Sequence, residues 1–364
     1  MNICFCIDTM ESGGAERVAS ILCNGFIRTG HSVDLVMISE KEEKSFYELD
    51  AQVKIYPLFA HNQNMKLSFI NKTKLLRKHF KTKKYDTVIS FLPNVNICVW
   101  LASIFSKKFL HITSERNNPF IDPQSKLKRF VKLLAFKNSD GIVCQTADAE
   151  NFYKKRTKNP TSVIKNPIEP SLLHDGKEST SNNILWVGRL EPQKNLHLLI
   201  DAFHKFNSNH PETQLLIYGS GSLRGEIETK ISQLHLMNNV KFLGNSDSWL
   251  SDNLDAAMFL NTSLYEGMSN SLLEAVLNQI PCIASDCPIG GSREIIAGSN
   301  NLLFENDNLS DLLSKMEYLY RNKKLISNIK ATSYLLREKY SVCNIVNEWL
   351  RFIEKIDGEK HGKN

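Results

Sequence analysis

The chain has 364 residues, a formal net charge of +6, 42% hydrophobic residues and 23% charged residues. This composition excludes an intrinsically disordered chain, and the length suits two domains better than one core. No apolar run approaches the ~18 residues of a membrane-spanning helix, and the first residues, "MNICFCIDTM", lack the features of a signal peptide. The eight cysteines are scattered without a C-x-x-C pair, so we expect a cytoplasmic protein in a reducing compartment.

Short apolar runs alternate with amphipathic stretches through the first half of the chain. A strand-like run at 2–8 is followed by a helical stretch at 14–30. Further strand-like runs lie at 32–38, 85–91, 108–113, 141–146 and 161–166. Continuous apolar strands separated by helices predict a parallel sheet covered on both faces. We therefore predict an N-terminal Rossmann-like domain over residues 1–166.

The alternation is interrupted at 164–170, "IKNPIEP", which holds two prolines and reads as a linker and hinge. It restarts with strand-like runs within 183–189, 213–221, 239–244, 254–263, 281–286 and 300–306. A second Rossmann-like domain is predicted over residues 167–340. The last segment, 341–364, is predicted to be helical, and its apolar stripe would allow it to cross back to the N-terminal domain.

Two doubly wound domains are expected to face each other across a cleft, and ligands of open parallel sheets bind beyond the carboxyl ends of the strands. The loop after the first strand contains Gly13 and Gly14 directly before a helix, a pattern that suits an anion or a hydroxyl as well as a simple tight turn. Its spacing is not G-x-G-x-x-G, so a nicotinamide site is not predicted.

The first strand of the second domain is followed by "VGRLEPQKN". Arg189 and Lys194 fall in one short loop at a strand's carboxyl end, where a guanidinium and an ammonium suit a diphosphate. The next strand ends in a glycine turn at Gly219, which permits the close approach of a nucleotide.

The stretch "SLYEGMSNSLLEA" follows the buried run "AAMFLNT". It predicts a tight bend at Gly267 and then a helix capped within 269–271, whose free amides form an anion site. Glu266 and Glu274 bracket this turn. The two carboxylates can contact hydroxyls at opposite ends of one ligand with its anion in the middle, and a sugar nucleotide has that form.

The segments "GGAER", "VGRLEPQKN", "EGMSNSLLEA" and "GGSREII" resemble the retaining glycosyltransferases of family four, which have the GT-B fold. The resemblance runs over nearly the whole chain, and the E-x7-E element is its most specific part. It implies that Arg189 and Lys194 hold the donor diphosphate, that Glu274 binds the ribose, and that Glu266 binds the transferred sugar.

The donor-binding residues that the resemblance implies are Gly13, Gly14, Arg189, Lys194, Gly219, Glu266, Gly267, Met268, Ser269, Asn270 and Glu274. The family usually works without a metal ion, and this sequence has no D-x-D element to hold one, so neither a metal nor a cofactor is expected. The segment "ITSERNNP" departs from the family, which often carries His where Arg116 aligns. Arg116 joins Glu266, Arg189 and Lys194 as a candidate catalytic group, although Glu115 or a backbone carbonyl could serve instead.

The positive charge is concentrated in the first half of the chain. Residues 1–180 hold 27 Lys and Arg against 18 Asp and Glu, a surplus of nine, and residues 181–364 carry a deficit of three. Two basic amphipathic stretches supply candidate contacts to a lipid-linked acceptor or an anionic membrane: Lys72, Lys74, Arg77, Lys78, Lys81, Lys126, Lys128 and Arg129. Solvated basic helices would explain the same pattern without a membrane.

Together these patterns predict a GT-B enzyme that moves a hexose or N-acetylhexosamine from a UDP-sugar, with retention, onto a glycan acceptor. The resemblance alone implies the acceptor, a glycan linked to undecaprenyl diphosphate at the inner face of the cytoplasmic membrane. Two other classes stay open: a sugar-nucleotide epimerase of similar fold and a non-catalytic nucleotide- or glycan-binding protein. No recognised motif supports nucleic-acid binding.

Overall fold

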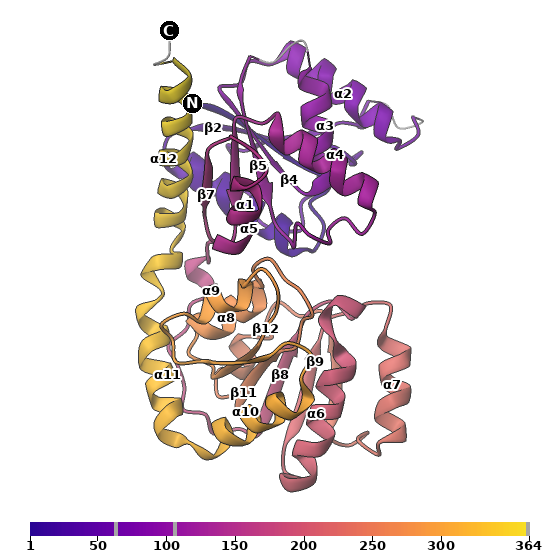
Figure 1. Ribbon diagram of the computed structural model, residues 1–364, viewed down its shortest axis with the longest axis vertical. Helices are drawn as coiled ribbons and strands as arrows, with labels where there is room; N and C mark the ends of the chain where they lie inside the picture. The colour runs from indigo at the N-terminus through magenta and orange to yellow at the C-terminus, as the bar shows by residue number, and fades with distance from the viewer. Residues whose placement is uncertain (62–64, 105–107, 362–364) are drawn as a thin grey trace. The chain divides into compact units, whose positions relative to one another are not determined.

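The computed structural model describes residues 1–61, 65–104 and 108–361 and forms two compact units (Figure 1). The first unit combines Met1–Pro167 with Tyr340–Asn364, and the second unit is Ile168–Lys339. Residues 362–364, which end the helix predicted over 341–364, lie outside the described residues.

The first unit is built on one parallel sheet. Its strands run in the order β3-β2-β1-β4-β5-β6-β7. They are β1 (Asn2–Ile7), β2 (Ser32–Met37), β3 (Lys54–Pro57), β4 (Thr87–Phe91), β5 (Leu110–Glu115), β6 (Gly141–Cys144) and β7 (Thr161–Val163). The helices are α1 (Gly14–Arg28), α2 (Phe69–Thr82), α3 (Pro93–Ser103), α4 (Lys126–Lys137), α5 (Ala147–Lys154) and α12 (Val342–His361).

Both faces of this sheet are covered, which is why its strands are almost continuously apolar. Alternate residues of β1 point to opposite faces, so Phe5 joins the core beneath α1 and α12, and Cys6 joins the core beneath α2 and α3. Gly25 in α1 gives α12 room, because a Cβ there would overlap the side chain of Val346. The apolar stripe of the last helix is therefore buried within the first unit.

The strand β3 lies at the edge of the sheet and was not expected from the sequence. Only four residues long, it pairs with β2 from Lys54 to Pro57, and only the last of the four is fully buried. A short, half-exposed edge strand that ends in proline carries little of the apolar signal by which buried strands are found.

The second unit repeats the architecture with six parallel strands in the order β10-β9-β8-β11-β12-β13. They are β8 (Asn183–Val187), β9 (Gln214–Tyr218), β10 (Val240–Gly244), β11 (Met258–Asn261), β12 (Cys282–Asp286) and β13 (Leu302–Glu305). The helices are α6 (Leu196–Asn209), α7 (Arg224–Gln233), α8 (Asn270–Leu277), α9 (Gly291–Ile296), α10 (Leu309–Arg321) and α11 (Lys323–Leu335). Short 3₁₀ turns are η1 (Pro170–Leu172), η2 (Pro192–Lys194), η3 (Ser251–Asn253) and η4 (Glu338–Tyr340), the last at the boundary between the units.

In each sheet the strand order reverses beside the first strand, between β1 and β4 in the first unit and between β8 and β11 in the second. The prediction of two doubly wound α/β domains is thereby confirmed. In such sheets the loops that leave the two strands at the reversal diverge to opposite faces and leave room for a ligand. The loops after β8 and β11 are therefore the first place to look for a site.

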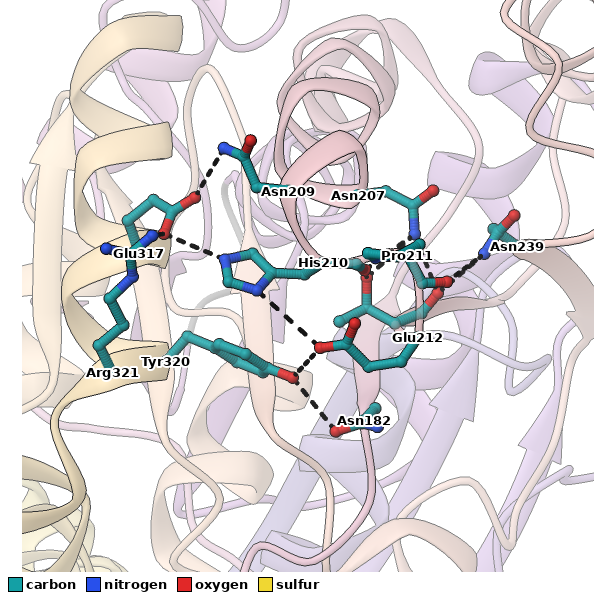
Figure 2. Close-up of polar contacts among 11 residues, drawn as sticks. Asn182, Asn207, Asn209, His210, Pro211, Glu212, Asn239, Glu317, Tyr320 and Arg321 are labelled. Atoms are coloured by element: carbon teal, nitrogen blue, oxygen red, sulfur yellow. Dashed lines mark hydrogen bonds and ion pairs between the residues drawn. The ribbon is translucent and has the colours of Figure 1, made fainter.

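A polar cluster fixes the amino-terminal side of the second sheet (Figure 2). The ring of His210, at the end of α6, lies 3.1 Å from a Glu317 oxygen on α10 and 3.9 Å from Glu212. Tyr320 donates a hydrogen bond of 2.8 Å to Glu212. These contacts join α6, α10 and the start of β9 at the edge away from the strands' carboxyl ends, so we assign them a structural role.

A buried polar chain in the first unit generates a prediction about pH. Tyr85 donates to Asp34 at 2.7 Å and accepts from His79 Nε2 at 2.8 Å. Burial of the imidazole lowers the pKa of His79 from 6.5 to about 4. The unfolded chain therefore takes up this proton before the folded unit does, and folding stability falls as the pH drops from about 6.5 towards 4, by roughly 3 kcal/mol.

We expect His79→Gln, which keeps a hydrogen-bond donor without the titration, to be less sensitive to acid than the wild type. Calorimetric unfolding of both proteins at about pH 7.5 and pH 5 measures this difference. An equal fall in the unfolding temperature of both proteins would show that His79 does not set the acid response.

Candidate functional site

The loop after β8 carries the two cations singled out from the sequence. Arg189 lies two residues beyond the strand and is exposed, and Lys194 ends the short turn η2. Asn195 then adopts a left-handed conformation with φ of 50°, which turns the chain directly into α6. Its side chain donates to Asp307 at 2.8 Å. This sharp connection keeps Lys194 close to the carboxyl end of β8.

The loop after β11 brings Glu266 to Lys194. The Lys194 ammonium and the Glu266 carboxylate form an ion pair, and their side chains are only 14% and 11% exposed. Ser263 donates a further hydrogen bond of 2.9 Å to the same Glu266 oxygen. The structure therefore joins two of the predicted site residues, which lie 72 positions apart in the sequence.

Hydrogen bonds between the two loops hold this pair in place. Leu264 N donates to the Gln193 carbonyl at 2.8 Å, and the Gln193 side chain donates to the Tyr265 carbonyl at 2.8 Å. Thr262 also donates to the Lys194 carbonyl at 2.9 Å. The two loops form one hydrogen-bonded layer, so the charges are positioned before any ligand arrives.

Helix α8 begins directly beyond this layer. Ser269 is its N-cap and accepts from Leu272 N at 3.4 Å, and Ser271 ties the helix to β8 by donating to the Val187 carbonyl at 3.0 Å. Met268 and Ser269 are buried, and Glu274 is buried in the second turn. The site thus combines a cation, a carboxylate and a helix N-terminus, three elements that suit an anionic ligand carrying hydroxyl groups.

A second loop supports the Glu266 turn from beneath. The residues before α9 hold Ile289 in a left-handed conformation, with φ of 79°, followed by Gly290 with φ of 71°. A Cβ on Gly291 would overlap the carbonyl oxygen of Gly267, so only glycine allows the two backbones to touch. Burial, reinforced by the charge of Glu266, raises the pKa of the neighbouring Cys287 thiol to about 12, so this cysteine stays protonated.

The glycine turn after β9 also packs on the site loop. Gly219, with φ of 131°, lies against the backbone of Gly188, and Gly221 lies against the backbone of Leu190. These glycines permit a close approach between two loops. A contact of Gly219 with a nucleotide stays a prediction.

In the first unit the predicted Gly13–Gly14 element forms the start of α1. Gly13 is the N-cap, and its backbone amide and carbonyl both bond to the Tyr47 hydroxyl, at 3.2 and 3.0 Å. Tyr47 was not identified from the sequence, because it lies in an irregular segment with no motif around it. Its hydroxyl fixes the extended backbone of Gly13, which has φ of −166°.

Arg116 follows β5, as predicted, and lies over the Phe91 ring with its guanidinium carbon 4.3 Å from the ring centroid. It donates to the Asn166 side chain at 2.7 Å, and Asn166 also accepts from Gln145 at 2.7 Å. Burial lowers the pKa of Arg116 to about 9, so the guanidinium remains charged at neutral pH. Glu115, the alternative, is occupied by a buried ion pair with Lys132 at 2.7 Å.

The basic residues predicted to meet an acceptor or a membrane fall into two groups. Lys72 pairs with Asp8 at 3.2 Å, Arg77 donates to the Leu101 carbonyl at 2.5 Å, and Arg129 donates to the carbonyls of Pro123 and Gln124 at 2.8 and 2.6 Å. These three hold the first unit together. The exposed residues that remain are Lys74, Lys78, Lys81, Lys126 and Lys128.

Neither a metal cluster nor a spanning helix is found in the part of the chain that the structure describes. Across 1–61, 65–104 and 108–361, no three or more His, Cys, Asp and Glu side chains are grouped so as to hold a metal ion. Within the same ranges, no helix has both the length and the apolar character needed to cross a bilayer.

Two protein-family models match this chain. "Glycosyltransferase Family 4" matches residues 12–172, and "Glycosyl transferases group 1" matches residues 174–335. A similar curated relative is the GalNAc-alpha-(1->4)-GalNAc-alpha-(1->3)-diNAcBac-PP-undecaprenol alpha-1,4-N-acetyl-D-galactosaminyltransferase of Campylobacter jejuni. It is 28% identical over 98% of this chain and 99% of its own length.

Solved structures share the fold. Sucrose-phosphate synthase from Thermosynechococcus elongatus superposes with a TM-score of 0.85 over 98% of this chain and 99% of that one, at 16% identity. HepE from Anabaena, in complex with UDP and glucose, gives a TM-score of 0.77 over 98% of this chain and 100% of its own, at 17% identity.

The contact between Gly291 and Gly267 generates a prediction about stability. We expect Gly291→Ala to push the Glu266 turn away from its support and to lower the thermal unfolding temperature by several degrees, a cost of about 2 kcal/mol. Gly225→Ala is the matched control, because a Cβ there meets open space. Differential scanning calorimetry measures the unfolding temperatures of both variants. Equal unfolding temperatures would mean that the turn does not depend on this contact.

Proposed function

This chain belongs to the family-four glycosyltransferases of GT-B fold, and we propose that it transfers a hexose or N-acetylhexosamine from a UDP-sugar, with retention, to a lipid-diphosphate-linked glycan. The observation that carries the donor half is the Lys194–Glu266 pair beside the N-terminus of α8. Similar structures solved in complex with UDP support a uridine nucleotide as the donor.

The proposed donor lies across the carboxyl ends of β8 and β11. Its diphosphate would meet the Lys194 ammonium, the exposed Arg189 guanidinium and the positive N-terminal end of α8. Glu266 would bind hydroxyls of the transferred sugar, and Glu274, one to two turns into α8, would bind the ribose. An arriving diphosphate competes with Glu266 for Lys194, so the pair would loosen as the carboxylate turns to the sugar.

The main contribution of the protein to this reaction would be electrostatic stabilisation of the leaving group. As the bond from the anomeric carbon to the diphosphate breaks, negative charge grows on the leaving phosphate, and a positioned cation lowers the barrier. Attack from the same face, with the leaving phosphate accepting the acceptor's proton, would give retention without a metal ion. The layered hydrogen bonds of Gln193 and Thr262 keep Lys194 oriented for this task.

The proposed acceptor is supported by the names of two relatives and by the positive charge of the first half of the chain. Two relatives from Campylobacter jejuni carry names that specify acceptors on undecaprenol or diphospho-undecaprenol. The first half of this chain holds a surplus of nine positive charges, and α2, α3 and α4 lie together on one face of its sheet (Figure 1). Exposed lysines on α2 and α4 would bring this face to an anionic membrane, where the protein would act as a peripheral enzyme.

The Lys194 assignment gives a direct test of the reaction. We expect Lys194→Ala to lower turnover about 10²- to 10³-fold, the usual loss when one preorganised electrostatic contact to the developing charge is removed. The measurement is mass spectrometry of products from a panel of UDP-sugars with lipid-linked glycans. Lys205→Ala, which removes an exposed lysine of α6, is the control and keeps full activity.

Incubation with the donor alone separates a transferase from an epimerase, since a new sugar nucleotide made without an acceptor would identify an epimerase. Near-wild-type transfer by Lys194→Ala would contradict the donor site.

The membrane assignment has its own test. We expect Lys74→Glu with Lys78→Glu to reduce binding to anionic vesicles at least tenfold, since each surface lysine contributes about 1 kcal/mol. Sedimentation with anionic and with neutral vesicles measures the effect. Lys323→Glu with Lys324→Glu makes the same charge change in the second unit and should bind as the wild type does. Equal weak binding of all proteins to both vesicles would remove the membrane assignment.

A further inference from the structure

The first unit contains a cavity of about 180 Å³ between α4 and α5. Of the site residues predicted from the sequence, only Arg129 lines it. Its walls are mostly apolar and come from Phe120, Phe130, Leu133 and Phe152. The volume lies below the roughly 300–1,000 Å³ of pockets that enclose a drug-sized ligand. It therefore fits a short apolar segment of a longer molecule.

The aromatic walls are ordered by their own contacts. Phe120 and Phe152 meet edge to face with ring centroids 4.8 Å apart, and Phe152 contacts Tyr153 at 5.0 Å. The Arg156 guanidinium lies 3.9 Å from the Phe152 centroid. A rigid aromatic wall beneath a cation is preformed, so a ligand would not have to bear the cost of ordering it.

The polar groups at the cavity's border already have partners. Lys132 and Glu115, each 3% exposed, form an ion pair of 2.7 Å, and Tyr153 donates to the same Glu115 oxygen at 2.5 Å. Lys132 also donates to the Asp122 carbonyl at 2.6 Å. A sugar would require these groups to break their bonds, whereas a hydrocarbon would leave them intact.

The rim of the cavity is exposed, apolar and cationic at once. Phe120 and Phe130 are 53% and 58% exposed, unusual for phenylalanine in a soluble unit. Arg129 lines the cavity, and the exposed Arg156 lies over two of its aromatic walls, 3.9 Å from the Phe152 centroid and 5.8 Å from that of Phe120. Helix α4 also carries exposed Lys126 and Lys128 beyond the lining and contains no acidic residue. Apolar walls with cations nearby are complementary to a molecule with a hydrocarbon chain and an anionic head.

The cavity is connected to the carboxyl edge of the sheet. Glu115, which binds the Lys132 and Tyr153 side chains, is the last residue of β5 and directly precedes Arg116. Its other oxygen accepts from Asn117 N at 3.2 Å. The cavity border and the Arg116 turn are thus one hydrogen-bonded assembly.

We propose that this cavity binds the diphosphate-proximal isoprene units of the lipid-linked acceptor and that the rim cations bind its diphosphate. The inference rests on the proposed function, because it assigns a lipid diphosphate acceptor to the same enzyme. The branched, unsaturated isoprene unit suits a short aromatic cavity, and adsorption to a bilayer surface would not require one. The cavity therefore recognises the acceptor's lipid in addition to any attraction of the unit to a membrane.

The test uses the full chain and farnesyl diphosphate, a soluble isoprenyl diphosphate, with inorganic pyrophosphate as the head group alone. Isothermal titration calorimetry should show farnesyl diphosphate binding at least tenfold more tightly than pyrophosphate. Phe130→Gln removes apolar contact from the exposed rim and should weaken farnesyl diphosphate about tenfold. Leu133→Phe fills the cavity without adding charge and should weaken it similarly.

Two control variants separate the cavity from a general apolar surface. Leu127→Gln changes a side chain on the same helix that is 73% exposed and does not line the cavity, and Leu335→Gln changes one in the second unit that is 75% exposed. Both should bind farnesyl diphosphate within twofold of the wild type. Leu133→Phe should retain the wild-type affinity for anionic vesicles, and the unfolding temperature of each variant confirms that it is folded.

Absence of farnesyl diphosphate binding by the wild type would overturn the inference, as would equal binding by the wild type, Phe130→Gln and Leu133→Phe. Equal losses in Leu127→Gln and Phe130→Gln would assign the binding to a non-specific surface and overturn it too. The proposed function is judged separately by transfer from UDP-sugars. Transfer to a lipid-linked glycan without any effect of the cavity variants would leave the enzyme assignment standing and remove the cavity's role.

Discussion

The ion pair between Lys194 and Glu266 is the interaction on which the candidate donor site depends. Both side chains are almost fully removed from solvent, and leaving either charge alone there would cost about 3–5 kcal/mol. The strand order explains how the pair forms, since β8 and β11 are neighbours at the reversal of the sheet although 70 residues separate them. The fold places the charges, and the hydrogen bonds of Gln193 and Ser263 orient them.

The first unit contains a second buried pair, Lys132 with Glu115, which acts in a different way. Tyr153 donates a hydrogen bond to Glu115, and Lys132 donates one to the backbone carbonyl of Asp122. The hydrogen-bonding groups of this pair are therefore satisfied within the first unit. The Lys194–Glu266 pair has fewer such partners among the described residues and remains slightly exposed. A pair that is less enclosed can exchange its partner for a ligand, whereas the Lys132–Glu115 pair serves to hold the Arg116 turn.

Sequence patterns predicted the sheets and the site loops because both leave local signals. Apolar runs marked the buried strands, and "VGRLEPQKN" and "SLYEGMSNSLLEA" carried charged and glycine residues where strands end. The edge strand β3 was missed because it is short and half-exposed. Tyr47 and Gln193 were missed because their roles arise from tertiary contacts alone. Helical spacing also could not separate exposed Lys74 from Lys72, which pairs with Asp8.

The charge balance of the two halves fits the two kinds of partner that we propose. A nucleotide diphosphate is small, so one lysine, one arginine and a helix N-terminus can bind it, and the second half needs no net positive charge. An anionic bilayer is extended, and its attraction grows with the number of exposed lysines. The surplus of nine charges in the first 180 residues, together with the exposed aromatic rim of α4, therefore suits a lipid partner better than a second soluble nucleotide.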